Sequence, residues 1–219
     1  MVKRFGGFGF ELGKENNALR REYTQAYHAC VSFVDAQIGL ILDKLKSQNL
    51  WDDTIVIFTS DHGYHLGEHF MWGKVTLFEE CARVPLVVRV PGTSQSGAIS
   101  DGLVETIDLF PTLAELCDLI VPAHLQGQSF GSLIRKPDGL GKSSAYTVVS
   151  RGTQLGRSIR TKRWRYAEWG EAKAAELYDL QRDPNEYTNL AKSPEHRDIV
   201  GQMKSRLAKR QAQAESGQN

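Results

Sequence analysis

The sequence predicts an α/β layer structure that is followed by a small antiparallel subdomain. Three observations lead to this fold class: a long helical stripe of apolar residues near the start, two continuous apolar runs after it, and a series of short alternating segments near the end. The chain has 219 residues, of which 41% are hydrophobic. That length is enough for one sizeable core and a small appendage.

The first elements alternate between helix and strand. Apolar residues recur at intervals of three or four from about Asn16 to Gln48, which predicts a long amphipathic helix. The run Thr54 to Thr59 is almost entirely apolar and β-branched, as in strands of parallel sheets that are covered on both faces. The run Val84 to Val90 predicts a second strand, with Pro85 near its start, where a missing N–H donor is tolerated.

The pattern of predicted elements changes in the second half of the chain. Apolar residues from Val104 to Leu116 predict another helix, despite Pro111 inside it. After Ser143 we expect short strands joined by turns and then a closing polar helix. These lie at about 145–149, 156–161, 164–169, 176–180 and, for the helix, 195–214. The order of elements is that of part of an α/β sheet with an appended antiparallel subdomain.

Composition excludes several functions. Lysine and arginine total 27 against 26 acidic residues, so the formal net charge of +1 gives no general attraction to nucleic acid or anionic membranes. No run of about eighteen apolar residues is present, so no membrane span is predicted. Three cysteines without close spacing, Cys30, Cys81 and Cys117, argue against a disulfide framework or a zinc ribbon. We expect each of them to be a small buried residue.

The segment that follows the first predicted strand combines the residue types of a binding site. Asp61 and His62 come at its carboxyl end, where ligands bind in open α/β sheets. Gly63 would let the backbone turn, so that neighbouring side chains point into a common cleft. Asp61 and His62 can both ligate a metal, although two ligands leave a cation under-coordinated. Lys74 could place a positive charge over an anionic group.

Ordinary structural roles compete with these functional ones. An Asp-His pair at a strand end is often a turn cap with a hydrogen-bonded histidine. Two further histidines, His65 and His69, are expected to be polar loop residues, and Glu68 could hold the loop. The three aromatic residues of the segment would pack beneath the loop; they are Tyr64, Phe70 and Trp72. Spacing alone therefore gives only weak support for an anion or metal site.

Several longer stretches resemble the type I sulfatases, and among these the iduronate-2-sulfatase branch. TSDHGYHLGEHFMWGK followed by FEECARVPLVVRVPG is similar to the family's metal-binding and sulfate-binding region. YHACVSFVDAQIGLILDKL and VETIDLFPTLAELCDL resemble the helices on either side of it, and GRSIRTKRWRYAEW and ELYDLQRDPNEYTNLA resemble strands of the C-terminal subdomain. The similarity covers most of residues 20–192 in the family's order.

This resemblance implies an alkaline-phosphatase-like fold, a doubly wound sheet with a small C-terminal antiparallel-sheet subdomain and a terminal helix. It implies domains at 1–142 and 143–219, the first belonging to the catalytic α/β domain. Asp61 and His62 would bind one divalent cation, Ca²⁺ in the family, although histidine suits calcium poorly and keeps manganese or zinc as alternatives. Lys74 would hold the sulfate of a sulfated sugar such as a glycosaminoglycan, and Tyr64 matches a position near the sugar. Members are periplasmic, extracellular or lysosomal.

One departure from the family bears on activity. Sulfatases attack with a formylglycine made from Cys or Ser in a C/S-x-P/A-x-R motif, beside an early Asp-Asp pair. The contexts here are CVSFV, CARVP and CDLIV, and none fits. We therefore expect a C-terminal half (a gene fragment, a split product or a truncated chain) whose nucleophile lies in a missing N-terminal half. That half would be its partner, and the isolated chain would be inactive.

Two other functions stay open at this stage. One is a phosphate or phosphonate monoester hydrolase of the same superfamily, because the Asp-His strand end is shared. The other is a non-catalytic module that retains sulfate or glycan binding. A basic group could also form a glycan-binding patch, with solvated charge on a hairpin as the alternative; it consists of Arg157, Arg160, Lys162, Arg163 and Arg165.

Overall fold

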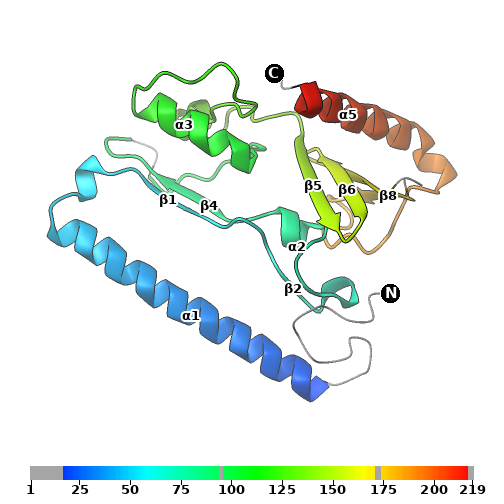
Figure 1. The fold of residues 1–219 in the computed structure, drawn as a ribbon, viewed down its shortest axis with the longest axis horizontal. Helices are drawn as coiled ribbons and strands as arrows, with labels where there is room; N and C mark the ends of the chain where they lie inside the picture. The colour runs from blue at the N-terminus through cyan, green and yellow to red at the C-terminus, as the bar shows by residue number, and fades with distance from the viewer. Residues whose placement is uncertain (1–16, 94–95, 171–173, 217–219) are drawn as a thin grey trace. The chain divides into compact units, whose positions relative to one another are not determined.

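The computed structural model describes residues 17–93, 96–170 and 174–216. Within the described residues the chain forms two compact units, one of residues up to 74 together with 85–93, the other of 75–84 together with the chain from 96 onward. Each unit has its own strands (Figure 1). The boundary at 142/143 that the sequence suggested stays a prediction.

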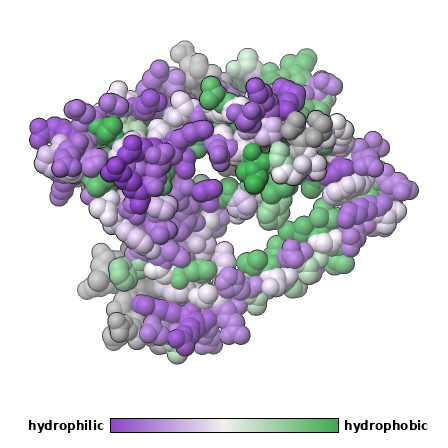
Figure 2. Space-filling view, turned by 180° about the vertical axis from the view of Figure 1, so that it is seen from behind, coloured by the Kyte–Doolittle hydropathy of each residue, from purple (hydrophilic) through white to green (hydrophobic). Residues whose placement is uncertain are grey.

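A long helix is the first element among the described residues of the first unit. Helix α1 spans Asn17–Ser47, close to the range that the apolar stripe predicted; Asn16, its expected first residue, lies outside the described residues. No residue of α1 is buried. Large apolar side chains are exposed along it, and Figure 2 shows hydrophobic surface over much of the helix. The exposed residues are Val31, Phe33, Val34, Leu40 and Ile41.

The two predicted strands of this unit pair with each other. Strand β1 (Val56–Thr59) and strand β4 (Leu86–Arg89) form a ladder in which Val56 faces Arg89 and Thr59 faces Leu86. The ladder is antiparallel, so the expectation of a parallel pairing was wrong here. The reason lies in the connection between the two strands. Residues 60–85 bring the chain back to the carboxyl end of β1, where β4 starts beside Thr59, so β4 runs in the opposite direction to β1.

A short hairpin lies within that connection. Strand β2 (His65–Leu66) pairs with strand β3 (Trp72–Gly73), and a single turn of 3₁₀-helix, Glu68–Phe70, joins them. Gly67 has a φ of 124° and Gly73 a φ of 102°. His69, Phe70 and Val75 also have positive φ, which is unfavourable for a β-branched residue such as Val75. The hairpin therefore brings position 74 back toward positions 61 and 62.

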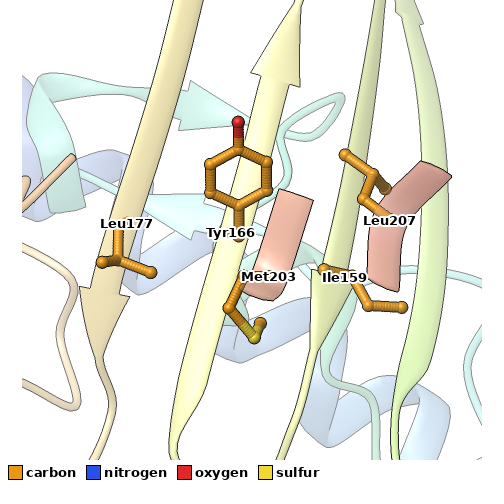
Figure 3. Packing of buried hydrophobic residues seen from close by; sticks show 5 residues of the cluster. All are labelled: Ile159, Tyr166, Leu177, Met203 and Leu207. Carbon is orange, nitrogen blue, oxygen red and sulfur yellow. The ribbon is translucent and has the colours of Figure 1, made fainter. Parts of the chain in front are cut away.

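The second unit contains the main antiparallel sheet. Its strands are β5 (Ala145–Arg151), β6 (Gln154–Arg160), β7 (Trp164–Trp169) and β8 (Ala174–Asp179), which pair in chain order. Helix α5 (Arg197–Ser216) covers one face of the sheet. Figure 3 shows the core between them. It consists of Ile159, Tyr166, Leu177, Met203 and Leu207. The sequence predicted all four strands and this helix.

Short helices complete the second unit. Helix α3 (Leu109–Leu116) follows a 3₁₀ turn, Thr106–Asp108, and keeps Pro111 in its first turn, where proline is tolerated. Helices α2 (Glu79–Ala82) and α4 (Gly131–Arg135) are shorter. No helix in the described part of the chain is long and apolar enough to cross a membrane.

Candidate functional site

Asp61 and His62 lie immediately beyond the carboxyl end of β1, as the sequence predicted. Ser60 Oγ donates a hydrogen bond to the His62 carbonyl at 2.8 Å, and the His62 N–H donates to Asp61 Oδ1 at 3.0 Å. These local bonds fix the turn. Gly63 is not among the glycines with positive φ, so the turn forms without a left-handed glycine at this position.

The His62 ring has a defined orientation. Its Nδ1 lies 2.9 Å from the Gly63 carbonyl oxygen, which can only accept, so Nδ1 carries the proton. The lone pair is then on Nε2. Asp61 Oδ2 lies 3.5 Å from this Nε2, and the Asp61 side chain is largely exposed. One carboxylate oxygen and one imidazole nitrogen are thus available close together.

Lys74 reaches the same place from the other end of the hairpin. Its Nζ lies 2.7 Å from His62 Nε2 and donates a hydrogen bond to it. The structure therefore brings together the three polar residues that the sequence singled out, Asp61, His62 and Lys74. The β2–β3 pairing explains how residues separated by twelve positions meet.

Tyr64 belongs to a group of aromatic residues beside this cluster. Its hydroxyl shares a hydrogen bond with the Tyr23 hydroxyl of α1, and its ring centroid lies 5.4 Å from that of Tyr27. Burial, followed by the bond to Tyr23, raises the pKa of Tyr64 well above its usual range. Tyr64 is therefore a neutral hydroxyl. No pattern in the sequence indicated the contact with Tyr23.

The remaining residues of the loop have structural roles. Glu68 Oε2 accepts a hydrogen bond from the Leu66 N–H at 2.6 Å, so Glu68 holds the loop, as one of our two interpretations proposed. His65 is fully buried, with its ring centroid 5.8 Å from that of His69. It is not the polar loop residue we expected. Trp72 is buried as predicted, whereas Phe70 is almost fully exposed rather than packed beneath the loop.

The residues at the site fit a divalent cation only in part. Asp61 Oδ2 and His62 Nε2 are suitable donor atoms at the spacing of two ligands of one ion. Within the ranges that the structure describes, no group of three or more His, Cys, Asp or Glu side chains could hold a metal ion. Calcium requires six to eight oxygen ligands. The described chain therefore offers two ligands, and the others would have to come from elsewhere.

The three cysteines differ in exposure. Cys81 is buried, as predicted, and burial raises the pKa of its thiol, which disfavours the reactive thiolate. Cys30 and Cys117 are exposed, so the expectation that they are buried was wrong. Cys30 lies within α1, none of whose residues is buried, and Cys117 follows the last residue of α3.

Three of the five basic residues of the β6–β7 hairpin form ion pairs within the second unit. Arg165 is buried and contacts Glu79, Glu186 and Ser158. Arg160 Nε lies 3.4 Å from Glu79 Oε1. Arg163 binds Asp179 through two nitrogens, and this pairing holds the pKa of the Asp179 carboxyl below its usual range. Carboxylates within the unit therefore pair with three of the five basic residues, Lys162 is exposed, and the glycan patch stays a hypothesis.

The chain matches two protein-family models. One, described as "Sulfatase", matches residues 3–119, and the other, described as "N-sulphoglucosamine sulphohydrolase, C-terminal", matches residues 67–213. Each covers more than half of the chain. The chain therefore belongs to the sulfatase family of the alkaline-phosphatase-like superfamily.

Individual relatives agree with this assignment. A sulfatase of Formosa agariphila is 32% identical over 197 residues, which are 90% of this chain and 38% of the relative. Mouse iduronate 2-sulfatase is 29% identical, with 83% and 46% covered. Because relatives with several other names match equally well, no single branch of the family is favoured. The chain spans about 40% of the length of the relatives it matches.

Solved structures confirm the predicted fold class. A protein solved in complex with its substrate D-glucosamine-2-N,6-O-disulfate superimposes with a TM-score of 0.85 at 27% identity, covering 90% of this chain and 42% of that one. The phosphonate monoester hydrolase of Agrobacterium radiobacter superimposes with a TM-score of 0.76 at 29% identity, covering 84% and 40%. The α/β arrangement, the small antiparallel sheet and the terminal helix are those of sulfatase structures.

Proposed function

We propose that this chain forms the C-terminal part of a sulfuric ester hydrolase that acts on sulfated sugars. The observation that supports this most directly is the convergence of Asp61, His62 and Lys74 at the carboxyl end of β1. A compact cation beside a pair of metal-ligand side chains is suited to binding a tetrahedral anion. The solved relative that binds a disulfated glucosamine supports sulfated sugars as the substrate class.

In this proposal each site residue has a distinct role. Asp61 Oδ2 and His62 Nε2 are two ligands of one divalent cation, Ca²⁺ by family, which would neutralise sulfate oxygens when bound. Lys74 holds the sulfate group and stabilises the charge that develops on it. In the structure the Lys74 Nζ donates a hydrogen bond to His62 Nε2, and a bound anion would replace His62 as the acceptor of that hydrogen bond. Tyr64 presents its ring toward the sugar.

The nucleophile must come from another polypeptide segment. No cysteine of this sequence has the context that is converted to formylglycine. The partner we propose is an N-terminal sulfatase segment with the C-x-P-x-R motif and the Asp-Asp pair, which would also complete the cation's ligands. The wide apolar surface of α1 supports such a partner, because a helix with apolar residues on several faces is normally buried.

Within the family we propose an iduronate-2-sulfatase-like specificity for sulfated glycans such as glycosaminoglycans. Its support is the histidine at position 62, where many sulfatases carry asparagine, together with the aromatic residue at position 64. Mouse iduronate 2-sulfatase is one of several similar relatives.

Complementation tests the proposed reaction. The 219-residue chain is fused behind, or co-expressed with, the N-terminal segment of the Formosa agariphila sulfatase in a host that makes formylglycine. Hydrolysis of p-nitrophenyl sulfate should appear and should disappear in Asp61→Asn. A complex that assembles, carries formylglycine and binds the cation but does not hydrolyse any sulfate ester would exclude the proposal.

A second candidate is phosphate or phosphonate monoester hydrolysis, which the similarity to the A. radiobacter enzyme favours. The same complex should be assayed with phenyl phosphonate esters beside sulfate esters. A higher kcat/KM for the phosphonate esters than for the sulfate esters would favour this second function. Binding of sulfated sugars without turnover of either ester would instead indicate a non-catalytic binding module.

A further inference from the structure

The segment that carries the proposed site residues consists of two limbs. The first limb, residues 61–64, carries Asp61, His62 and Tyr64; the second limb, residues 72–74, carries Trp72 and Lys74. The β2–β3 ladder between them has only two residue pairs, His65 with Gly73 and Leu66 with Trp72. A two-stranded ladder of this length has little stability of its own. The distance from Lys74 to His62 therefore depends on what else holds the limbs together.

Tyr23 of α1 contacts both limbs. Its hydroxyl shares a hydrogen bond with the hydroxyl of Tyr64 in the first limb. Its ring meets Trp72 of the second limb edge-to-face, with centroids 5.0 Å apart and an interplanar angle of 79°. Trp72 is 5% exposed, so its position is fixed by packing. One side chain thus links the limb that bears Asp61 and His62 to the limb that bears Lys74.

We infer that Tyr23 is a positioning residue, which fixes the separation of Lys74 from His62 by holding Tyr64 with its hydroxyl and Trp72 with its ring. The inference rests on the proposed role of Lys74 in binding sulfate. Binding groups that are held at their working separation lose less conformational freedom when the ligand arrives. Tyr23 itself need not touch the substrate.

Three substitutions separate the two contacts. Tyr23→Phe removes the hydroxyl and keeps the ring on Trp72, Tyr64→Phe removes the other half of the same hydrogen bond, and Tyr23→Leu removes both contacts. Tyr27→Phe is the matched control. Tyr27 lies one turn further along the same helix and contacts Tyr64 through its ring.

Amide hydrogen exchange rates of the 219-residue chain test the positioning role of Tyr23 without any ligand. In Tyr23→Phe, exchange at residues 65–66 and 72–73 should be about fivefold faster, the effect of losing one hydrogen bond. Exchange in β1 and β4 should not change. Tyr23→Leu should give a larger effect, and Tyr27→Phe none. Unchanged exchange in both limbs of Tyr23→Phe and Tyr23→Leu would overturn the inference.

The affinity for inorganic sulfate, measured by NMR titration, tests the consequence for the site. Tyr23→Phe and Tyr64→Phe should each weaken binding about three- to tenfold, and the double variant should be no weaker than either single one. Losses that multiply in the double variant would overturn the shared contact. If wild type and Lys74→Ala bind sulfate equally, the proposed function of Lys74 fails, and the exchange experiment still decides whether Tyr23 positions the limbs.

Discussion

At the scale of single residues, the contact between Lys74 and His62 is the most informative. The Lys74 ammonium group lies 2.7 Å from His62 Nε2 and donates a hydrogen bond to its lone pair, so each group is at present the partner of the other. When ligands bind, Lys74 could instead contact an anion, and His62 Nε2 could ligate a metal cation. A metal ion with a sulfate group bound to it would provide a partner for each of the two side chains.

The first prediction concerns Lys74 in the complemented enzyme. Lys74→Ala should lower kcat/KM for p-nitrophenyl sulfate about a hundredfold to a thousandfold, because a charge that stabilises the transition state is removed. Lys136→Ala, at an exposed position in the second unit, is the control and should behave as wild type. Steady-state kinetics measure both. Equal values of kcat/KM for Lys74→Ala and wild type would exclude Lys74 as the sulfate-binding residue.

The second prediction concerns Glu186, whose carboxyl is almost fully buried. Burial raises its pKa from 4.5 to about 7, although Arg165, at 2.6 Å, lowers it and the Glu79 N–H donates to it. A carboxyl with a raised folded-state pKa stabilises the fold below about pH 4.5 and loses that contribution as the pH rises through 7. The change is on the order of 3 kcal/mol.

Urea unfolding of wild type and Glu186→Gln across this pH range checks the prediction. The difference between their free energies of unfolding should move in favour of the glutamine variant as the pH rises from about 5 to 8. Glu195→Gln, at an exposed position, should show no such drift. Parallel curves for wild type and Glu186→Gln would mean that Arg165 keeps Glu186 ionised throughout.

At the scale of elements, helix α5 and the sheet of β5 to β8 enclose the hydrophobic core of the second unit, and we expect this core to determine the stability of that unit. Leu207 is 2% exposed and packs in the cluster with Met203 and Ile159. Leu207→Ala should lower the free energy of unfolding of the second unit by about 2–5 kcal/mol, because the removed side chain leaves a cavity. Leu140→Ala, at a position that is 92% exposed, should change it by less than about 0.5 kcal/mol. Thermal or chemical unfolding followed by circular dichroism measures both.

Helix α1 leads to the fourth prediction. Its exposed Phe33 and Ile41 belong to an apolar surface with no cover among the described residues. Purified alone, the chain should bind a hydrophobic dye, and Phe33→Ser with Ile41→Ser should reduce that binding. Addition of the N-terminal sulfatase segment should suppress it in wild type. A chain that melts cooperatively and binds no dye would contradict the idea that a partner segment covers α1.

The sequence predicted most of these elements because each carries a local signal. The stripe of α1, the alternation of β5 to β8 and the polar helix α5 are periodic patterns that tertiary contacts did not override. The antiparallel pairing of β1 with β4 was missed because an apolar run gives no direction. The bond between Tyr23 and Tyr64 and the burial of Arg165 were missed because they join residues far apart in sequence. The clustering of Asp61, His62 and Lys74 followed from the family resemblance, not from spacing.

At the scale of the whole molecule, the chain holds one part of a proposed active site. The fifth prediction follows: the purified 219-residue chain should not hydrolyse an aryl sulfate with any divalent cation, because a covalent route needs a nucleophile that its cysteines do not supply. A continuous assay with p-nitrophenyl sulfate and added Ca²⁺, Mn²⁺ or Zn²⁺ tests this. Turnover that survives repurification would mean that another residue of this chain acts as the nucleophile.

Strand β7 has two chemically different faces, and this difference bears on how the second unit reaches its native structure. Tyr166 points to the apolar core under α5, while its neighbour Arg165 points to Glu79 and Glu186. A shift of one residue in the pairing of β7 with β6 or β8 would place Arg165 in the apolar core and Tyr166 beside the two carboxylates. Each misplaced group would be penalised separately, so misregistered intermediates should be short-lived. The buried ionic cluster should therefore disfavour pairing of β7 in the wrong register while the second unit folds.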